Sequence, residues 1–313
     1  MNRPLVSIVM ASFQRAHLLN RSLECYAEQE FNNDLLEIIV IDDHSTDGTR
    51  DLVTRWSHRT KIRATVLTPS PKLTGWRDCG AVLNHGIRAS QGEYVLLTHP
   101  EVMPGKTSVK HCYDILSRDE LLRINRAVNA NKDVNGLWVD SSGNRLEPGS
   151  YACCPVYYMS PRDQELIDTV DWLGCGALAI REIEGFYDNR MGGHPDYSHE
   201  VTDLVGTDGF RIQEWESWVF GGCSRRTWAE LGGMLETDRW GSVDVGFMQR
   251  RKTLGIPTRT TRPAKDIVVH QNHDSAIDVQ TPRNEGPWVR ELSGFKLTDP
   301  KELVYPAVNH LWG

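Results

Sequence analysis

Two adjacent acidic residues follow a short aliphatic run, and their carboxylates are the first candidates for chemistry. Ile38 to Ile41 lead directly into Asp42 and Asp43. Four aliphatic residues in a row are typical of a strand buried on both faces of a parallel sheet, and open α/β sheets bind ligands at the carboxyl ends of such strands. A carboxylate there can accept hydrogen bonds from the imide N–H of uracil or from a ribose hydroxyl. The alternative is that both acids cap the turn and a helix beginning near Thr46.

A second pair of ligand-type side chains follows another apolar run, Tyr94 to Leu97. His99 and Glu101 are two residues apart, so on a continuous strand both side chains point the same way. An imidazole with a carboxylate can bind Mn²⁺ or, less readily, Mg²⁺. The alternative is a polar strand end that binds nothing.

Candidate nucleoside and phosphate contacts flank these acids in the sequence. Ser12 is small and leaves room for a base or ribose, and Arg15 can reach a phosphate. An ordinary strand-to-helix turn would explain the same two residues. Arg77 precedes a predicted helix, where a guanidinium and the N–H groups of the helix start can together hold a diphosphate.

The segments that must position these residues alternate between strand and helix patterns. Strands are predicted at 5–11, 37–41, 62–67 and 94–97, and helices at 17–29, 48–57 and 81–89. This alternation predicts an α/β domain with a parallel, doubly wound sheet and right-handed crossovers.

The rest of the chain has a less regular pattern. A helix is predicted at 108–130, short strands between turns at 135–158, a loop or lid at 191–210, and helical order at 228–255. Prolines interrupt the last forty residues, which could wrap around the core or contribute to an oligomer interface.

Composition narrows the class of protein. The chain has 313 residues, of which 39% are hydrophobic and 25% are charged, as in soluble globular proteins. A net charge of −7 argues against a general polyanion-binding surface. We find no run of 18 apolar residues and expect no membrane span. The seven cysteines lack metal-binding spacing, which predicts reduced thiols in a cytoplasmic protein, with a structural disulfide as the alternative.

Four motifs occur in a recognisable order between residues 4 and 105. They are VSIVMASF, VIDDHSTDGT, the Asn84-His85-Gly86 triplet and GEYVLLTHPE. In order and spacing this stretch resembles the family-2 glycosyltransferases, which have the GT-A fold, and the motifs are specific in combination. The resemblance implies a nucleotide-diphospho-sugar donor, usually UDP-linked, and a divalent metal, Mn²⁺ or Mg²⁺.

The resemblance also implies roles for individual residues. It places Ser12 and Asp43 at the nucleoside, with Asp43 on the uracil, and Arg77 near the diphosphate. Asp42 then has either a structural role or a position on the ribose side.

The chain departs from the family at the motif that usually reads Asp-x-Asp, because His99-Pro100-Glu101 stands there. Glu101 matches the second acid, which usually binds the metal directly, and its side chain is one methylene longer. His99 replaces the first acid and loses a charge that often serves the ribose. The resemblance therefore keeps a metal site on Glu101, while donor choice can differ.

A second block, residues 215–247, continues the resemblance with the turn Gly232-Gly233 and an acid near a helix start. Asp244 stands where the family has the general base that deprotonates the acceptor hydroxyl. The alternative for Asp244 is a helix N-cap, and Glu214 and Glu216 are weaker candidates for the base.

Two further residue types add to the candidate site. Enzymes with this fold often supply a late histidine to the metal or the diphosphate, and His270, after the strand-like run 267–269, fits best, with His273 as the alternative. A lone histidine is more often structural. Several of the ten tryptophans lie near these motifs and could stack on a sugar, although core packing explains most tryptophans.

The resemblance thus implies an inverting glycosyltransferase, which we expect to have three parts. Residues 1–105 form the donor-binding half, 106–275 the acceptor-binding and catalytic half, and 276–313 a C-terminal extension. Asp244 takes the acceptor proton, and a metal on Glu101 and His270, helped by Arg77, neutralises the departing diphosphate.

The acceptor stays open among a glycan, a protein, a small molecule and a hydroxylated nucleic-acid base. One alternative is a GT-A protein that binds nucleotide sugars but has lost turnover. A sugar-phosphate nucleotidyltransferase is a more distant alternative, because its glycine-rich basic loop after the first strand is missing here.

Overall fold

A computed structural model describes residues 3–70, 79–127, 131–132, 138–139, 142–143, 149–154, 156–159, 164–165, 167, 218–234, 236, 243–261 and 268–273. The strands are β1 (Val6–Ser12), β2 (Leu36–Asp42), β3 (Arg63–Leu67), β4 (Tyr94–Thr98), β5 (Val102–Met103), β6 (Asn131–Lys132), β7 (Trp138–Val139), β8 (Tyr151–Cys153), β9 (Val156–Tyr158), β10 (Phe220–Ser224), β11 (Thr258–Thr260) and β12 (Val268–His270). The helices are α1 (Ala16–Ala27), α2 (Thr49–Thr60), α3 (Cys79–Ala89), α4 (Ser108–Ala127), α8 (Arg225–Leu231) and α9 (Val243–Thr253), with a 3₁₀ turn at Asn33–Leu35.

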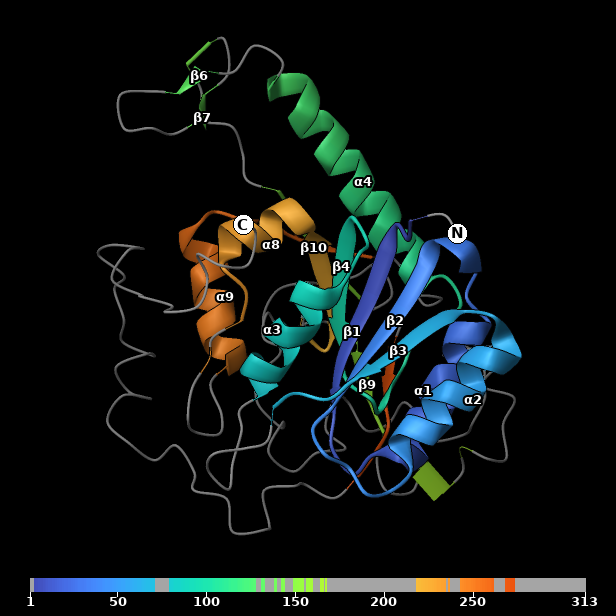
Figure 1. Cartoon of the computed structure of the whole chain (residues 1–313). Helices are drawn as coiled ribbons and strands as arrows, with labels where there is room; N and C mark the ends of the chain where they lie inside the picture. Colours follow the sequence, from blue (N-terminus) through green and yellow to red (C-terminus); the bar gives the residue numbers. More distant parts are fainter. Residues whose placement is uncertain are drawn as a thin grey trace.

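Four parallel strands form the N-terminal part of the sheet, in the order β4-β1-β2-β3 (Figure 1). All seven residues of β2 are buried, as expected for a strand covered on both faces. Ser12 pairs with Asp42, and Met10 pairs with Thr98, so β1, β2 and β4 end close together. The candidate residues at these strand ends therefore share one edge of the sheet.

Beyond β4 the sheet continues with strands from the second half of the chain. β10 is antiparallel to β4 and to β8, and β11 completes the order β11-β8-β10-β4-β1-β2-β3. Gly222 permits the close approach of β10 to β4, because a Cβ there would lie 2.0 Å from the carbonyl oxygen of Val95. The predicted doubly wound, mostly parallel α/β sheet is confirmed.

The helices cover the two faces of the parallel strands. α1 and α2 connect strands that step in one direction, and α3 connects β3 back to β4, so right-handed crossovers put α3 on the opposite face. α3 packs on β1 and β2 through Gly86, where a Cβ would lie 2.5 Å or less from the side chains of Val9 and Ile41. A glycine is needed here because any larger residue would push the helix off the sheet.

The buried carboxylate of Glu37 lies at the opposite, amino-terminal end of the same strands. Oε1 of Glu37 accepts hydrogen bonds from the Ser7 hydroxyl at 2.5 Å and from the backbone N–H groups of Gln91 at 2.5 Å and Gly92 at 3.2 Å. Arg225, at the start of α8, donates to the carbonyl oxygens of Ser90 and Gly92 in the same turn. The turn that leads into β4 is thus held by side chains from β1, β2 and α8.

Asn84 joins the two halves of the chain. Its amide nitrogen donates to the Met234 carbonyl at 2.9 Å and to Glu236 at 2.8 Å, and its amide oxygen accepts from the Met234 N–H at 2.7 Å. Gly233 has a φ of +79°, and a Cβ there would lie 2.5 Å from the Asn84 side chain. The Gly-Gly turn after α8 is therefore shaped around a side chain of α3.

A second, three-stranded sheet has the order β5-β12-β9. His270 of β12 pairs with Val102 of β5. Val102 is the residue after Glu101 in the sequence. This pairing brings residues near position 270 beside the end of β4.

Several expectations concern residues outside those described, including the loop or lid at 191–210 and the extension at 276–313. None of the described helices combines the length and the apolar character needed to cross a bilayer. The six described cysteines, Cys25, Cys79, Cys112, Cys153, Cys154 and Cys223, are free thiols, in line with the predicted reduced state.

Candidate functional site

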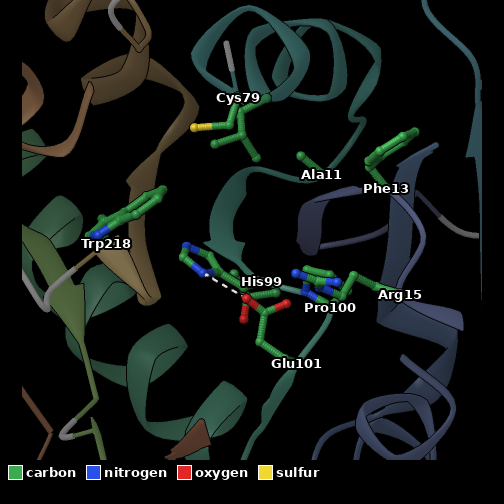
Figure 2. Close-up of a pocket in the computed structure, with 10 residues that line it drawn as sticks. Ala11, Phe13, Arg15, Cys79, His99, Pro100, Glu101 and Trp218 are labelled. Atoms are coloured by element: carbon green, nitrogen blue, oxygen red, sulfur yellow. Dashed lines mark ion pairs between the residues drawn. The ribbon is translucent and has the colours of Figure 1, made fainter. Parts of the chain in front are cut away.

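A pocket opens at the carboxyl ends of β1 and β4 (Figure 2). In Figure 2, Trp218 and His99 form one side, Phe13 and Arg15 lie on the other, and Cys79 enters from α3. The lining residues are Ala11, Phe13, Arg15, Cys79, Leu83, Thr98, His99, Pro100, Glu101 and Trp218. Three predicted site residues, Arg15, His99 and Glu101, therefore meet in one cavity.

His99 and Glu101 lie in a turn and not on a strand, which corrects the sequence interpretation. β4 ends at Thr98, and the Val102 N–H donates to the His99 carbonyl at 3.1 Å across the turn. Pro100 has no N–H to continue a ladder. The turn still brings the side chains together, with His99 Nδ1 3.5 Å from Glu101 Oε1.

Three imidazoles surround the buried carboxylate of Glu101. Its Oε1 lies 3.5 Å from His99 Nδ1, 3.5 Å from His270 Nε2 and 3.4 Å from His273 Nε2. Burial alone would raise the pKa of Glu101, but the surrounding imidazoles of His270, His273 and His99 lower it well below its ordinary value. Glu101 is therefore ionised at neutral pH.

The tautomer of His270 follows from its neighbour. His270 Nδ1 lies 3.0 Å from the carbonyl oxygen of Gln271, and because a carbonyl only accepts, Nδ1 carries the proton. Burial lowers the pKa of His270, against the opposing effect of Glu101. Nε2 of His270 faces Glu101, 3.5 Å from its Oε1, and is the ring nitrogen that can serve as a ligand.

His273 has the opposite tautomer. A nitrogen of the Arg15 guanidinium lies 3.4 Å from His273 Nδ1, and since arginine only donates, Nδ1 accepts. In the neutral ring the proton is then on Nε2, which faces Glu101. His273 therefore connects Arg15, on the pocket wall, to the carboxylate.

The turn is held from behind by α1 and by the segment after β12. The Ser22 hydroxyl donates to the Pro100 carbonyl at 2.7 Å. Gln271 donates to the Glu101 carbonyl at 3.1 Å from both its backbone N–H and its side-chain amide, which also donates to the Leu18 carbonyl at 3.0 Å. The backbone of Glu101 is thus fixed by hydrogen bonds that are themselves buried.

These residues are suited to holding a divalent metal. His99, Glu101 and His270 each offer one ligand atom, and these atoms all lie within 4.8 Å of one another. Imidazole nitrogens and carboxylate oxygens are common ligands of transition metals. Trp218 packs edge-on against the His99 ring, with centroids 4.2 Å apart, and holds that ring in place.

The nucleoside candidates lie next to this pocket, at the ends of β1 and β2, but do not line it. Ser12, Asp42 and Asp43 are buried. Asp42 Oδ1 accepts from the Ser45 N–H at 3.0 Å, and the Asp43 N–H donates to the Ser12 carbonyl at 2.9 Å. Asp42 therefore shapes its own turn, and the nucleoside roles of all three residues stay predictions.

The loops after β1 and β2 brace each other. The Gln14 N–H donates to the Ser45 hydroxyl at 2.9 Å, and Oδ2 of Asp47 accepts from the Ala16 N–H at 2.8 Å, at the start of α1. Asp47, and not Asp42 or Asp43, thus caps a helix, and α2 begins at Thr49, one residue after the predicted start at 48.

The remaining predicted residues are placed less completely. Asp244 is half-buried in the first turn of α9 and is not among the residues that line the pocket. Arg77, Glu214 and Glu216 lie outside the described residues. The general base and the diphosphate contact of Arg77 therefore stay predictions.

Part of the pocket wall could not be assigned from the sequence. Phe13 ends the VSIVMASF motif but has no predicted role, Cys79 carries no ligand spacing, and Trp218 is one of several tryptophans near the motifs. Gln271, which fixes the Glu101 backbone, is recognisable only from its hydrogen bonds.

The N-terminal part of the chain is similar to known proteins. The model of a family described as Glycosyl transferase family 2 matches residues 7–122. Probable glycosyltransferase YdaM of Bacillus subtilis is 26% identical over 117 residues, which are 37% of this chain and 27% of that protein. Validoxylamine A glucosyltransferase of Streptomyces hygroscopicus subsp. jinggangensis is 42% identical over 60 residues, 19% of this chain and 14% of that protein. The matched stretches thus span about a quarter or less of these relatives.

Among solved structures, a crystal structure of S. aureus TarS 1-349 in complex with UDP-GlcNAc has a TM-score of 0.52 at 13% sequence identity. The likeness covers 87% of this chain and 59% of that chain. The resemblance to family-2 glycosyltransferases is confirmed over residues 7–122, and the GT-A fold is confirmed.

Proposed function

We propose that this chain is a metal-dependent, inverting glycosyltransferase that moves a sugar from a UDP-linked donor to an acceptor hydroxyl. The observation that carries the proposal is the Glu101 cluster, which combines a carboxylate with imidazoles at the carboxyl end of β4. Open α/β sheets bind their ligands at this edge. The family match over residues 7–122 supports sugar transfer, and the UDP-GlcNAc in the TarS crystal structure supports a UDP-linked donor.

The donor-binding half, residues 1–105, provides the nucleotide contacts in this proposal. Asp43 accepts from the uracil, while Ser12 and Asp42 lie on the ribose side, where β1 and β2 end together. Arg15 lines the pocket and faces the diphosphate, and Arg77 adds a second guanidinium. His99, in place of an acid, leaves this end of the donor site less negative.

The Glu101 cluster serves the leaving group. A divalent ion held by Glu101, His99 and His270 would stabilise negative charge on the departing diphosphate. His273 and Arg15 hold Glu101 in position, and Arg15 contributes a further positive charge at the pocket wall.

The acceptor-binding half, residues 106–275, supplies the general base. Asp244 takes the proton from the acceptor hydroxyl as that oxygen forms a bond to the anomeric carbon on the face opposite the diphosphate, which inverts the configuration. The acceptor is a glycan, a protein, a small molecule or a hydroxylated nucleic-acid base. The free thiols of the described cysteines support the proposal of a cytoplasmic location.

The test is a donor-hydrolysis and transfer screen with UDP-sugars and Mn²⁺, run on wild type, Glu101→Ala and Asp244→Asn. We expect Glu101→Ala to lose hydrolysis and transfer, and Asp244→Asn to lose transfer. Asp34→Asn, on an exposed residue far from the pocket, is the matched control. Undiminished activity in both site variants would overturn the assigned roles.

The same screen separates the proposal from a nucleotide-sugar-binding protein without turnover. Binding of a UDP-sugar with neither hydrolysis nor transfer would support that second reading.

A further inference from the structure

The ligand set at the end of β4 is unusually rich in nitrogen. Of the three ligand atoms that lie within 4.8 Å of one another, two are imidazole nitrogens, from His99 and His270, and one is a carboxylate oxygen of Glu101. Mg²⁺ prefers oxygen ligands, whereas Zn²⁺, Co²⁺ and other first-row ions accept imidazole well. The side chains therefore discriminate between ions.

The orientation of His270 suits a cation between the side chains. With Nδ1 donating to the Gln271 carbonyl, Nε2 is the ring nitrogen that faces the Glu101 carboxylate, at 3.5 Å. A cation between Nε2 and Oε1 would bind both atoms. The second hydrogen bond of the ring fixes the ligand nitrogen, as in many metal sites.

The separations suit a compact coordination shell. Glu101 Oε1 lies 3.5 Å from both His99 Nδ1 and His270 Nε2, long for a hydrogen bond. Ligands bonded to a tetrahedral ion at about 2.1 Å lie about 3.4 Å from each other. The two carboxylate-to-imidazole distances are therefore close to those of a tetrahedral site.

The ligands are held in place by the protein itself. Ser22 and Gln271 bind the backbone on both sides of the Glu101 Cα, and Trp218 packs on His99. Three preset protein ligands and one open position are typical of a catalytic zinc-type site. A site of this kind can bind its ion before any nucleotide arrives.

We propose that His99, Glu101 and His270 form a resident site for an imidazole-preferring transition metal, which binds without the nucleotide sugar and which Mg²⁺ does not displace. The inference rests on the proposed function for the place of the ion beside the donor diphosphate. It replaces the expectation of Mn²⁺ or Mg²⁺ with an order of affinity. In this order Zn²⁺ and Co²⁺ bind most tightly, Mn²⁺ less tightly and Mg²⁺ least.

His273 has a different part in this arrangement. Because Arg15 occupies its Nδ1, the proton on Nε2 faces Glu101, so the ring orients the carboxylate and does not bind the ion. His273 is a positioning residue, and its loss should weaken the site without changing the donor set.

The test measures metal binding without nucleotide. Purified full-length protein is stripped with a chelator, loaded with Co²⁺ and followed by visible absorption, and Zn²⁺, Mn²⁺ and Mg²⁺ are then compared as competitors. We expect an intense Co²⁺ spectrum typical of low coordination number, displacement by Zn²⁺, displacement by Mn²⁺ only at concentrations at least about ten-fold higher, and no displacement by Mg²⁺.

Four variants locate the ligands. His270→Ala should abolish the spectrum, and His99→Asp should narrow the preference for Co²⁺ over Mg²⁺ by at least about ten-fold because it replaces nitrogen with oxygen. His273→Ala should keep the spectrum with affinity lower by about 10- to 100-fold. His58→Ala, on the exposed surface of α2, is the control and should match wild type.

Two outcomes would overturn the inference: Co²⁺ binding only in the presence of UDP, or displacement by Mg²⁺ and Zn²⁺ at similar concentrations. Either can occur while sugar transfer proceeds, which leaves the proposed function standing. Conversely, resident metal in a protein that neither binds nor turns over a UDP-sugar would leave the metal site standing and refute the proposed function.

Discussion

Glu37 and Glu101 are both buried carboxylates on the same sheet, yet their surroundings differ in kind. Glu37, at the amino-terminal end, receives three hydrogen bonds of 2.5 to 3.2 Å from neutral donors. Glu101, just beyond the carboxyl end of β4, has three imidazole nitrogens at 3.4 to 3.5 Å and opens onto a pocket. Glu37 therefore has hydrogen-bond donors close by, whereas the imidazole nitrogens around Glu101 lie at distances that leave room for an ion.

The difference shows how burial alone misleads in the search for functional residues. A buried acid saturated by backbone and hydroxyl donors stabilises a turn, because removing it leaves several buried donors without an acceptor. A buried acid among loosely spaced imidazoles gains its best interactions when a ligand completes the set. The two glutamates can therefore be told apart by mutation.

The largest expected effect is on turnover by Glu101→Ala. We expect transfer to fall by about 10²–10³-fold, because the stabilisation of the leaving group is lost. The free energy of unfolding should stay within about 1 kcal/mol of wild type, since the three imidazoles are partly exposed at the pocket and can be solvated. Transfer kinetics and urea denaturation measure the two quantities. A fall in stability without loss of turnover would show that Glu101 has a structural role, like the one expected of Glu37.

Glu37→Ala should show the opposite pattern. The Ser7 hydroxyl and two backbone N–H groups lose their acceptor in the interior, which should lower the free energy of unfolding by about 3–5 kcal/mol. The folded fraction should bind Co²⁺ like wild type. Glu30→Ala, on an exposed glutamate, is the matched control, and a stability change no larger than that control would refute the structural role.

Asn84→Asp should have a smaller effect at the junction between the two halves. A carboxylate can still accept from the Met234 N–H, but it cannot donate to the Met234 carbonyl and it repels Glu236. We expect a loss of about 2–3 kcal/mol in the free energy of unfolding. Asn20→Asp, on the exposed surface of α1, controls for the added charge, and equal stability of the two variants would show that Asn84 does not join the halves.

The smallest expected effect is a shift in the pH dependence of metal binding. Protons and metal compete for Nε2 of His270, and burial lowers the pKa of this residue below its ordinary value. A lower pKa means fewer competing protons, so Co²⁺ should stay bound to a pH below about 6.5, the ordinary value for histidine, and be lost on further acidification. Co²⁺ absorption titrated with acid gives the midpoint, and a midpoint above that value would contradict the expected direction.

The N-terminal elements could be predicted from the sequence because their patterns are local. The observed β2 (Leu36–Asp42) and α1 (Ala16–Ala27) agree with the predicted 37–41 and 17–29 to within two residues. β4 ends at Thr98, one residue beyond the predicted 94–97, but the placement of His99 and Glu101 on a continuous strand is wrong because Pro100 lies in a turn that takes both residues off the strand.

The non-local parts could not be predicted in this way. β5, β9 and β12 have two or three residues each, too few for a periodic pattern, and they form a sheet only by pairing across the chain. That pairing decides that His270 faces Glu101, and the hydrogen bonds of Gln271 and Arg15 then distinguish His270 from His273. Such assignments depend on neighbours far apart in sequence.

The distance along the chain between Glu101 and its partners has a consequence during synthesis. Gln271 follows Glu101 by 170 residues and still hydrogen-bonds to it, and His270 lies beside it. On a ribosome, where N-terminal segments emerge and fold first, β1 to β4 can pair long before these residues exist. The proposed set of metal ligands is therefore complete only after His270 has been synthesised, so a chain that stops before this residue can form the parallel strands but not the proposed metal site.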